Sequence, residues 1–162
     1  MKRSQPKAGP IESPAKQLAG FIAKFDPAIA KLVRSARSVL RKRFPTAIEL
    51  VYDNYNALAI GFCTSERVSD CIFSLAVYAR GVNLYFYYGR SLPDPHHLLQ
   101  GSGNQGAFIR LDSVATLDRP EVKELIRAAV KNAWPPLPAT GRGYTVIRSV
   151  SAKQRPRRPA SS

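Results

Sequence analysis

The stretch Cys71–Tyr88, CIFSLAVYARGVNLYFYY, is the part of the chain that best indicates its fold. Apolar and polar side chains alternate along both of its halves, which is typical of β-strands that bury one face. The Arg80–Gly81 pair between the halves suits a tight turn, so the stretch predicts an antiparallel hairpin. The face expected to be buried carries Cys71, Phe73, Leu75, Val77 and Ala79 in the first half and Val82, Leu84, Phe86 and Tyr88 in the second.

Further stretches predict additional strands on both sides of this hairpin. Ile48–Asp53 and Ala57–Cys63 flank the turn-prone trio Asn54–Asn56, and Ala107–Leu111 follows a glycine tract. Near the C-terminus, Tyr144–Val150 is a candidate for a short strand added to the edge of the sheet. The middle of the chain is therefore expected to be a sheet.

Helical patterns occupy both ends of the expected domain. Ala15–Phe25 predicts a first helix, and Asp26–Pro27 starts a second one, which ends at Phe44–Pro45 because the residue before proline avoids helical geometry. A last helix follows Asp118, its expected cap, and stops at Pro135–Pro136. We therefore predict an α+β fold: an antiparallel sheet of about five strands with helices from both ends of the domain packed on one face.

Basic residues dominate the charge of the chain. Its 162 residues carry a formal net charge of +14, and residues 141–162 contain no acid. We expect a disordered basic segment at 1–13, a domain at 14–140, and a basic extension at 141–162 that forms at most one edge strand before it becomes disordered. A field of this sign favours nucleic acid or another polyanion as partner.

Two groups of basic residues are candidates for contacts with a polyanion. Lysine and arginine side chains that neutralise phosphates release counterions, which favours binding without sequence readout. An ordinary solvated helix face and a solubilising tail are the alternative interpretations, and the sequence leaves them open. The candidates are Lys31, Arg34, Arg37 and Arg41 on the second helix and Arg142, Arg148, Lys153, Arg155, Arg157 and Arg158 in the extension.

A ligand groove on the sheet is a further candidate site. Tyrosines that alternate along a strand can stack bases or line an apolar pocket, and successive glycines let backbone amides converge on an anion. The alternatives are cross-strand packing of the tyrosines and a helix cap followed by a turn at the glycines. The groove candidates are Tyr52, Tyr85, Tyr87, Gly101, Gly103 and Arg110.

No motif in the chain indicates catalysis or a resident metal, so we lean against an enzyme and expect no cofactor. The only histidines, His96 and His97, are adjacent, and their side chains diverge in most backbone conformations. No apolar run reaches the roughly 18 residues that cross a bilayer, and no secretory signal is evident, so we expect a cytoplasmic protein without a membrane partner. Cys63 and Cys71 flank a turn where a disulfide is conceivable, but in that compartment they are expected to stay reduced.

From about residue 14 to residue 134 the chain resembles the YdhG-like bacterial domains. The resemblance rests on the two-helix start, VNLYFYYG at 82–89, LPDPHHLLQGSG at 92–103, AFIRL at 107–111 and RPEVKELIRAAVKNAW at 119–134. It implies a compact α+β fold, and some members are described as frataxin-like iron chaperones. Members often carry a lysine after Gly-x-Gly, where this chain has Asn104.

The sequence therefore predicts a small binding or adaptor domain that engages nucleic acid or another polyanion through its basic arm and basic helix face. An iron-chaperone-like or small-molecule-binding protein is the alternative. Iron prefers oxygen ligands, which clustered surface carboxylates supply, whereas the first two helices here are basic. The residues therefore disfavour iron binding, although the resemblance to YdhG-like domains implies it for some members. The sequence does not indicate an oligomeric state.

Overall fold

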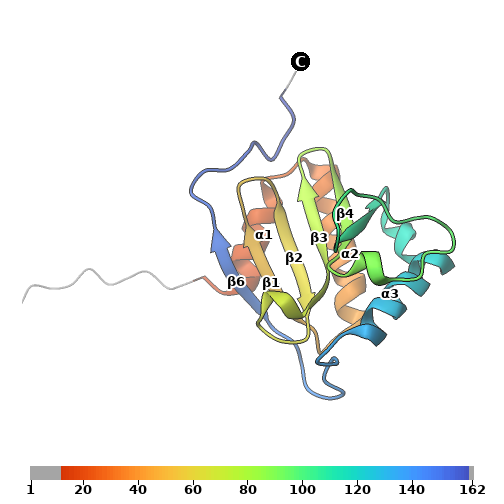
Figure 1. The fold of residues 1–162 in the computed structure, drawn as a ribbon. Coiled ribbons are helices and arrows are strands. Elements are labelled where there is room, and N and C mark those ends of the chain that lie inside the picture. The colour runs from red at the N-terminus through yellow and green to blue at the C-terminus, as the bar shows by residue number, and fades with distance from the viewer. Residues whose placement is uncertain (1–11, 161–162) are drawn as a thin grey trace, which may run out of the picture.

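The computed structural model describes residues 12–160 and has an α+β fold. A six-stranded sheet has the order β5-β4-β3-β2-β1-β6, and α1, α2 and α3 lie against one of its faces (Figure 1). What the sequence suggests for residues 1–11 lies outside this range. No helix among the residues described is long and apolar enough to cross a membrane.

The five strands expected from alternation are confirmed, each within two residues of its predicted ends. They pair antiparallel in chain order, and the predicted central hairpin is present, with Phe73 opposite Phe86 and Leu75 opposite Leu84. The strands are β1 (Ile48–Asp53), β2 (Leu58–Cys63), β3 (Cys71–Tyr78), β4 (Gly81–Phe86) and β5 (Ala107–Leu111).

A sixth strand corrects the expectation of an antiparallel sheet. β6 (Thr145–Val150) lies beside β1 and runs parallel to it, so the sheet is mixed. The segment after the last helix delivers the chain to the end of the sheet where β1 begins, and this sets the direction of β6. Gly143 permits the close approach, because a Cβ atom there would lie 1.8 Å from the carbonyl oxygen of Ala47. The Gly143 amide donates instead to the carbonyl of Pro45 at 2.8 Å.

The helices begin at prolines, whose fixed φ suits the first helical position. They are α1 (Pro14–Ala23), α2 (Pro27–Arg43) and α3 (Pro120–Asn132). Asp118 does not cap α3 as predicted: Arg119 is the cap residue, and Asp118 forms an ion pair with Arg43 at 2.6 Å. The helix starts at the proline, one residue too late for the Asp118 carboxylate to reach its amides.

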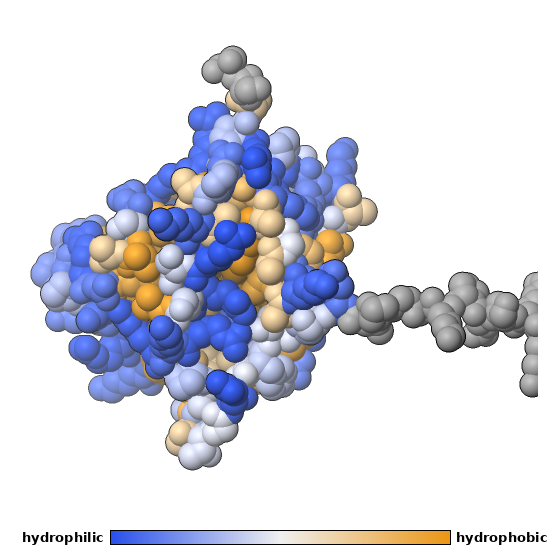
Figure 2. Space-filling view, turned by 180° about the vertical axis from the view of Figure 1, so that it is seen from behind, coloured by the Kyte–Doolittle hydropathy of each residue, from blue (hydrophilic) through white to orange (hydrophobic). Residues whose placement is uncertain are grey.

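One continuous core fills the space between the helices and the sheet. Aromatic side chains from three strands meet at its centre: Phe73 stacks on Phe62 and contacts Phe86 edge to face, and Val33 and Leu125 of the helices belong to the same core. Burying each large apolar side chain contributes about 1.5–3 kcal/mol. Seen from the helix side, hydrophilic residues cover most of the surface and leave smaller hydrophobic areas between them (Figure 2).

A β-bulge moves one predicted core residue to the other face of the sheet. Phe62 faces Phe73, but Cys63 faces Cys71, so Ile72 is the extra residue on β3. Cys71 therefore packs with Cys63 on the sheet face opposite the helices.

The two cysteines form a disulfide, which corrects the expectation of reduced thiols. Antiparallel pairing places their Cβ atoms directly opposite each other, the arrangement in which two sulfur atoms can meet.

Candidate anion-binding cavity

A buried carboxylate on β1 anchors the basic face of α2. Glu49 accepts hydrogen bonds from Arg37 at 2.7 and 2.8 Å and from Arg41 at 2.5 Å. Thr145 of β6 donates a further hydrogen bond to it at 2.8 Å. A carboxylate in this position is tolerated only when it is paired, and the pairing in turn fixes the direction of both guanidinium groups.

Five basic side chains line one cavity beside this anchor. The cavity has a volume of about 450 Å³ and lies between α2, the segment that leads into β1, and the turn before β6. No carboxylate is among the described residues that line it, so the potential inside the cavity favours an anion. The five are Arg34, Arg37, Arg41, Lys42 and Arg142, and four of them are predicted polyanion contacts.

Sequence reasoning missed two members of this site, Lys42 and Glu49. Lys42 lies eight residues after Arg34 on the same helix, so helical spacing alone could have placed it on the same face. Glu49 shares its face of β1 with Asp53 and alternates with Ile48, Leu50 and Tyr52, so the pattern of the strand indicated a solvent-facing acid rather than a buried one.

The remaining basic candidates do not join the cavity. Lys31, Arg148 and Lys153 are exposed elsewhere on the surface. Arg155 and Arg158 line a separate groove at the far end of β1. The structure therefore divides the predicted polyanion-binding residues among several places.

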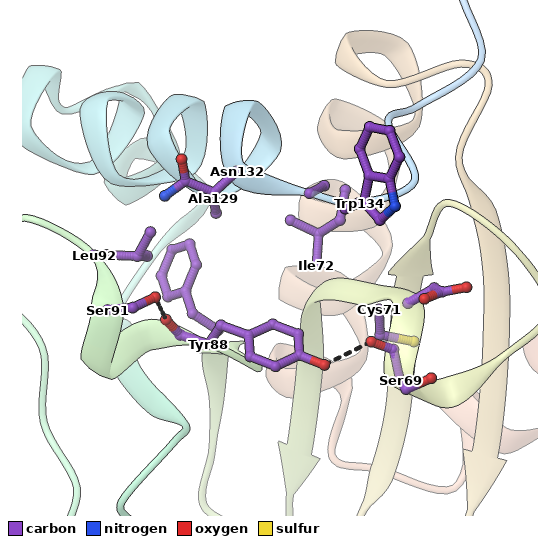
Figure 3. Close-up of a pocket in the computed structure, with 12 residues that line it drawn as sticks. Ser69, Cys71, Ile72, Tyr88, Ser91, Leu92, Ala129, Asn132 and Trp134 are labelled. Atoms are coloured by element: carbon purple, nitrogen blue, oxygen red, sulfur yellow. Dashed lines mark hydrogen bonds between the residues drawn. The ribbon is translucent and has the colours of Figure 1, made fainter.

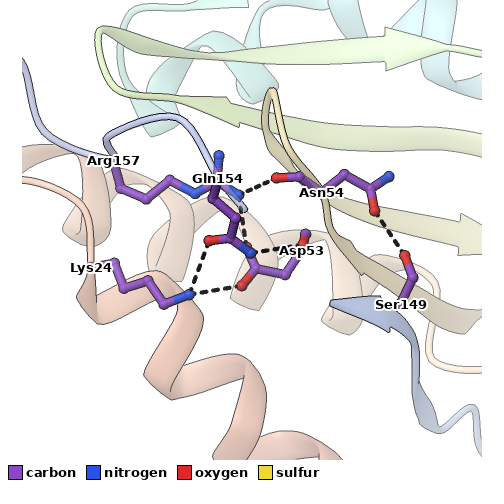
Figure 4. A network of polar contacts seen from close by, with 6 residues as sticks. All are labelled: Lys24, Asp53, Asn54, Ser149, Gln154 and Arg157. Carbon is purple, nitrogen blue, oxygen red and sulfur yellow. Dashed lines mark hydrogen bonds and ion pairs between the residues drawn. The ribbon is translucent and has the colours of Figure 1, made fainter. Parts of the chain in front are cut away.

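A second buried carboxylate ties the C-terminal extension to the domain. Asp53, fully buried at the end of β1, accepts hydrogen bonds from Lys24 and Arg157, each at 2.9 Å (Figure 4). Gln154 donates to the backbone carbonyl of Asp53 at 2.9 Å. The Arg157 guanidinium also lies 5.7 Å from the ring centre of Phe25. Arg157, a predicted polyanion contact, is thus an internal ion-pair partner with 6% of its surface exposed.

The extension follows a defined course over the end of the sheet, although its composition predicts disorder. The amides of Ser151 and Arg155 donate to the carbonyls of Asp53 and Tyr55, each at 2.9 Å.

The environment of Asp53 also changes its acidity. Burial alone would raise the pKa of the Asp53 carboxyl, but the hydrogen bonds from its neighbours outweigh burial and hold this pKa below its usual value.

The tyrosines of the predicted groove share the sheet face opposite the helices. The rings of Tyr85 and Tyr87 meet edge to face with their centres 5.3 Å apart. Burial raises the pKa of Tyr87, and the nearby Tyr52 adds to the shift. Arg110 does not reach toward them but donates to the carbonyl of Arg80 at 2.7 Å. The packing of these rings agrees with the cross-strand alternative.

The glycine tract folds over Tyr85. The carbonyl oxygens of Gly101 and Gly103 both accept hydrogen bonds from Arg90. A Cβ atom at Gly106 would lie 1.7 Å from the Tyr85 hydroxyl oxygen, so only glycine permits this close contact. Because the tract uses its carbonyl groups to meet a cation within the protein, its arrangement suits a turn better than an anion cradle.

An apolar cavity that sequence reasoning did not find lies beside the C-terminal end of α3. Its volume is about 260 Å³, and Ile72, Phe86 and Ala129 are among the residues that line it (Figure 3). Trp134 stands at the cavity with 84% of its surface exposed. Tyr88 donates to the carbonyl of Ser69 at 2.7 Å and closes another side. The lining comes from distant segments of the chain, so no local motif indicated it.

Within residues 12–160, no group of three or more His, Cys, Asp or Glu side chains is placed to hold a metal ion. A scan of protein-family models, a search of curated proteins and a search of solved structures each found no match to this chain. The resemblance to YdhG-like domains stays a prediction, and the interpretation of the site rests on its geometry.

Proposed function

We propose that this protein binds a phosphate-bearing polyanion, nucleic acid foremost, through the basic cavity beside α2. The observation that carries this proposal is the convergence of four arginines and one lysine on a single cavity. Arginine suits this role because its planar fork of N–H groups matches the oxygens of a phosphate.

The anchored arginines retain donors for such a ligand. Each guanidinium has five N–H groups, and Glu49 engages two from Arg37 and one from Arg41. Since Glu49 already holds both side chains in place, binding requires little further ordering of them. Arg34, Lys42 and Arg142 are exposed and add the charge that attracts the ligand.

Point substitutions test this proposal better than removal of the basic extension. Deleting residues after 140 would remove the Thr145 and Arg157 side chains, which bind the two buried carboxylates of β1. The fold itself would then change along with the charge. Replacing Arg34 and Arg142 by glutamine instead removes two exposed charges from the cavity, and neither residue forms an ion pair within the part of the chain that the structure describes.

We expect the Arg34→Gln, Arg142→Gln double variant to bind labelled oligonucleotides on the order of tenfold more weakly in a fluorescence-anisotropy salt series. The slope of log affinity against log salt should flatten by about 0.7–0.9 for each phosphate that the variant no longer neutralises. The matched control replaces Arg127 and Lys131, which are exposed on α3, and its affinity should fall far less. Equal decreases in both double variants would show that only the overall charge matters and would contradict a cavity site.

The apolar cavity beside Trp134 favours a second candidate function, the binding of a small apolar molecule. Pockets for such ligands are concave and mostly apolar with a few polar groups, as this one is. Trp134 is the only tryptophan of the chain, so its fluorescence reports on this cavity alone. Titration with an apolar dye should shift that emission and saturate at one molecule per chain, whereas a linear, non-saturating change would contradict a defined site.

A further inference from the structure

Two exposed tyrosines and three arginines meet at the end of the sheet opposite the basic cavity. The turns of the β1–β2 and β3–β4 hairpins both lie at this end, and the C-terminal segment passes it (Figure 1). Together they form an open groove of about 860 Å³. Its polar and aromatic lining consists of Tyr55, Asn56, Tyr78, Arg80, Arg155 and Arg158.

The aromatic rings of this groove are presented to solvent. Tyr55 is 44% exposed and Tyr78 is 43% exposed, although both flank strands whose other aromatic residues are packed. The Arg155 guanidinium lies 5.5 Å from the ring centre of Tyr55, a cation–π contact that holds the two side chains together. The Arg155 amide also donates to the Tyr55 carbonyl at 2.9 Å.

The buried ion pair of Asp53 and Arg157 explains how the tail is held over this groove. Burying a charged pair is costly and often adds little net stability, so its structural consequence is informative. Here it fixes the residues on either side of Arg157, which places Arg155 and Arg158 at the groove. None of the described residues that line the groove is a carboxylate, so positive charge dominates it, and the nearest acid to Arg158 is Asp26 at 3.9 Å, outside the lining.

We propose that this groove binds an unpaired strand of nucleic acid, with bases stacked on Tyr55 and Tyr78 and phosphates held by the three arginines. A positively charged groove with exposed aromatic rings is the arrangement by which proteins hold single strands without reading their sequence. Bases inside a duplex are already stacked and do not reach such rings. This inference goes beyond the basic cavity, which requires only phosphates, and it does not depend on that cavity.

The two sites are separate enough to be tested one at a time. Residues 47–55 span β1 from the basic cavity to the groove, and at about 3.3 Å per residue in a strand this distance is on the order of 25 Å. A labelled eight-nucleotide thymidine strand, (dT)8, is the probe, and substitutions in one site at a time show which of the two sites holds it. The full-length protein is used throughout.

We expect the Tyr55→Ala, Tyr78→Ala double variant to bind (dT)8 at least about tenfold more weakly, because stacking on an aromatic ring contributes measurably for each base. The double phenylalanine variant should keep most of the affinity, since its rings remain. The salt dependence should stay unchanged in the alanine variant because the phosphate contacts persist. Tyr88→Ala is the matched control, as Tyr88 is 47% exposed but lies at the apolar cavity.

A strand without bases separates stacking from charge. An abasic eight-unit probe should bind the native protein about as weakly as (dT)8 binds the alanine variant. Equal binding of the abasic probe and (dT)8 to the native protein, or equal binding of an eight-base-pair duplex, would overturn the proposal. If cavity variants alone weaken (dT)8 binding, the groove proposal is wrong and the cavity function stands. If tyrosine variants alone weaken it, the groove proposal is supported, and the cavity function is judged separately by the salt series with the Arg34→Gln, Arg142→Gln variant.

Discussion

Glu49 and Asp53 lie at the two ends of β1, on the same face of the sheet, and both are paired with basic side chains, yet their surroundings differ. The arginines that meet Glu49 have 22% and 38% of their side-chain surface exposed and line an open cavity. The Arg157 side chain that meets Asp53 has 5% exposed. One carboxylate thus positions arginines for a ligand, while the other draws an arginine into the protein.

The difference shows why net charge alone is a poor guide to a binding surface. Arg37 and Arg157 are equally basic and both are predicted polyanion contacts, but only Arg37 keeps donors that a ligand can reach. A buried arginine stabilises the fold that carries other basic residues. Its effect on binding is therefore indirect.

Removal of the Asp53 carboxylate should have the largest effect of the changes considered for these two residues. Asp53→Ala should lower the free energy of unfolding by about 3–5 kcal/mol, because it leaves the buried Arg157 guanidinium without its counter-ion. The Arg157 Nε atom already has no partner among the described residues, and once Asp53 is gone only the Asn54 carbonyl, at 2.5 Å, still accepts from this guanidinium. Urea denaturation at neutral pH measures the change as a lower midpoint with an unchanged slope.

Two further variants control this result. Asp26→Ala removes an exposed carboxylate that lies 3.9 Å from Arg158, and its cost should stay within about 1 kcal/mol. Asp53→Leu combined with Arg157→Met should recover part of the missing stability, because no buried charge is then left alone. A single Asp53→Ala variant as stable as the native protein would show that the pair contributes nothing.

The strands could be predicted from the sequence because alternation is local, whereas the direction of β6 could not. A strand runs parallel or antiparallel to its neighbour according to which end of the sheet the preceding loop reaches, and here that depends on the close contact of Gly143 with Ala47. The bulge at Ile72 was equally hidden, because the alternation of β3 reads the same with either facing of Cys71.

Only the part of the candidate site that lies on one helix, α2, could be predicted from the sequence. Helical spacing brought Arg34, Arg37 and Arg41 together correctly, and the structure adds Arg142 through the position of β6. The composition of the tail indicated a solvated segment, and nothing local shows that Arg157 turns inward. The two acids of β1 gave no signal either, because they alternate with Ile48, Leu50 and Tyr52 as solvent-facing residues would.

Replacing Glu49 by glutamine tests how the two carboxylates differ in their effect on ligand affinity. Glu49→Gln removes the negative charge beneath the cavity, so the affinity for a labelled oligonucleotide should rise roughly three- to tenfold at low salt. The same change should lower the free energy of unfolding by about 1–3 kcal/mol, less than the decrease at Asp53, because the glutamine oxygen can still accept a hydrogen bond from an arginine and keep it in place. Anisotropy and urea denaturation on the same samples measure both effects.

Asp53→Asn is the matched variant, since it removes the same charge from the same strand. It should leave the affinity for the oligonucleotide nearly unchanged in protein that remains folded, because Arg157 is not accessible to the ligand. An equal rise in affinity in both variants would mean that total charge governs binding. The distinction between the two carboxylates would then be wrong for function.

The smallest effect expected is a pH dependence that belongs to Asp53. Its pKa is lower in the folded protein than the value of about 3.9 in an unfolded chain, so the unfolded state binds a proton first as the pH falls. The stabilisation is therefore complete above about pH 5 and declines below it, by up to about 1.4 kcal/mol for each pH unit. The difference in unfolding free energy between the native protein and Asp53→Asn should shrink from pH 5 to pH 3. Carboxylates present in both proteins, such as Glu121, titrate alike in the two and cancel, so a constant difference would mean that Asp53 keeps its ordinary pKa and is not held by its basic neighbours.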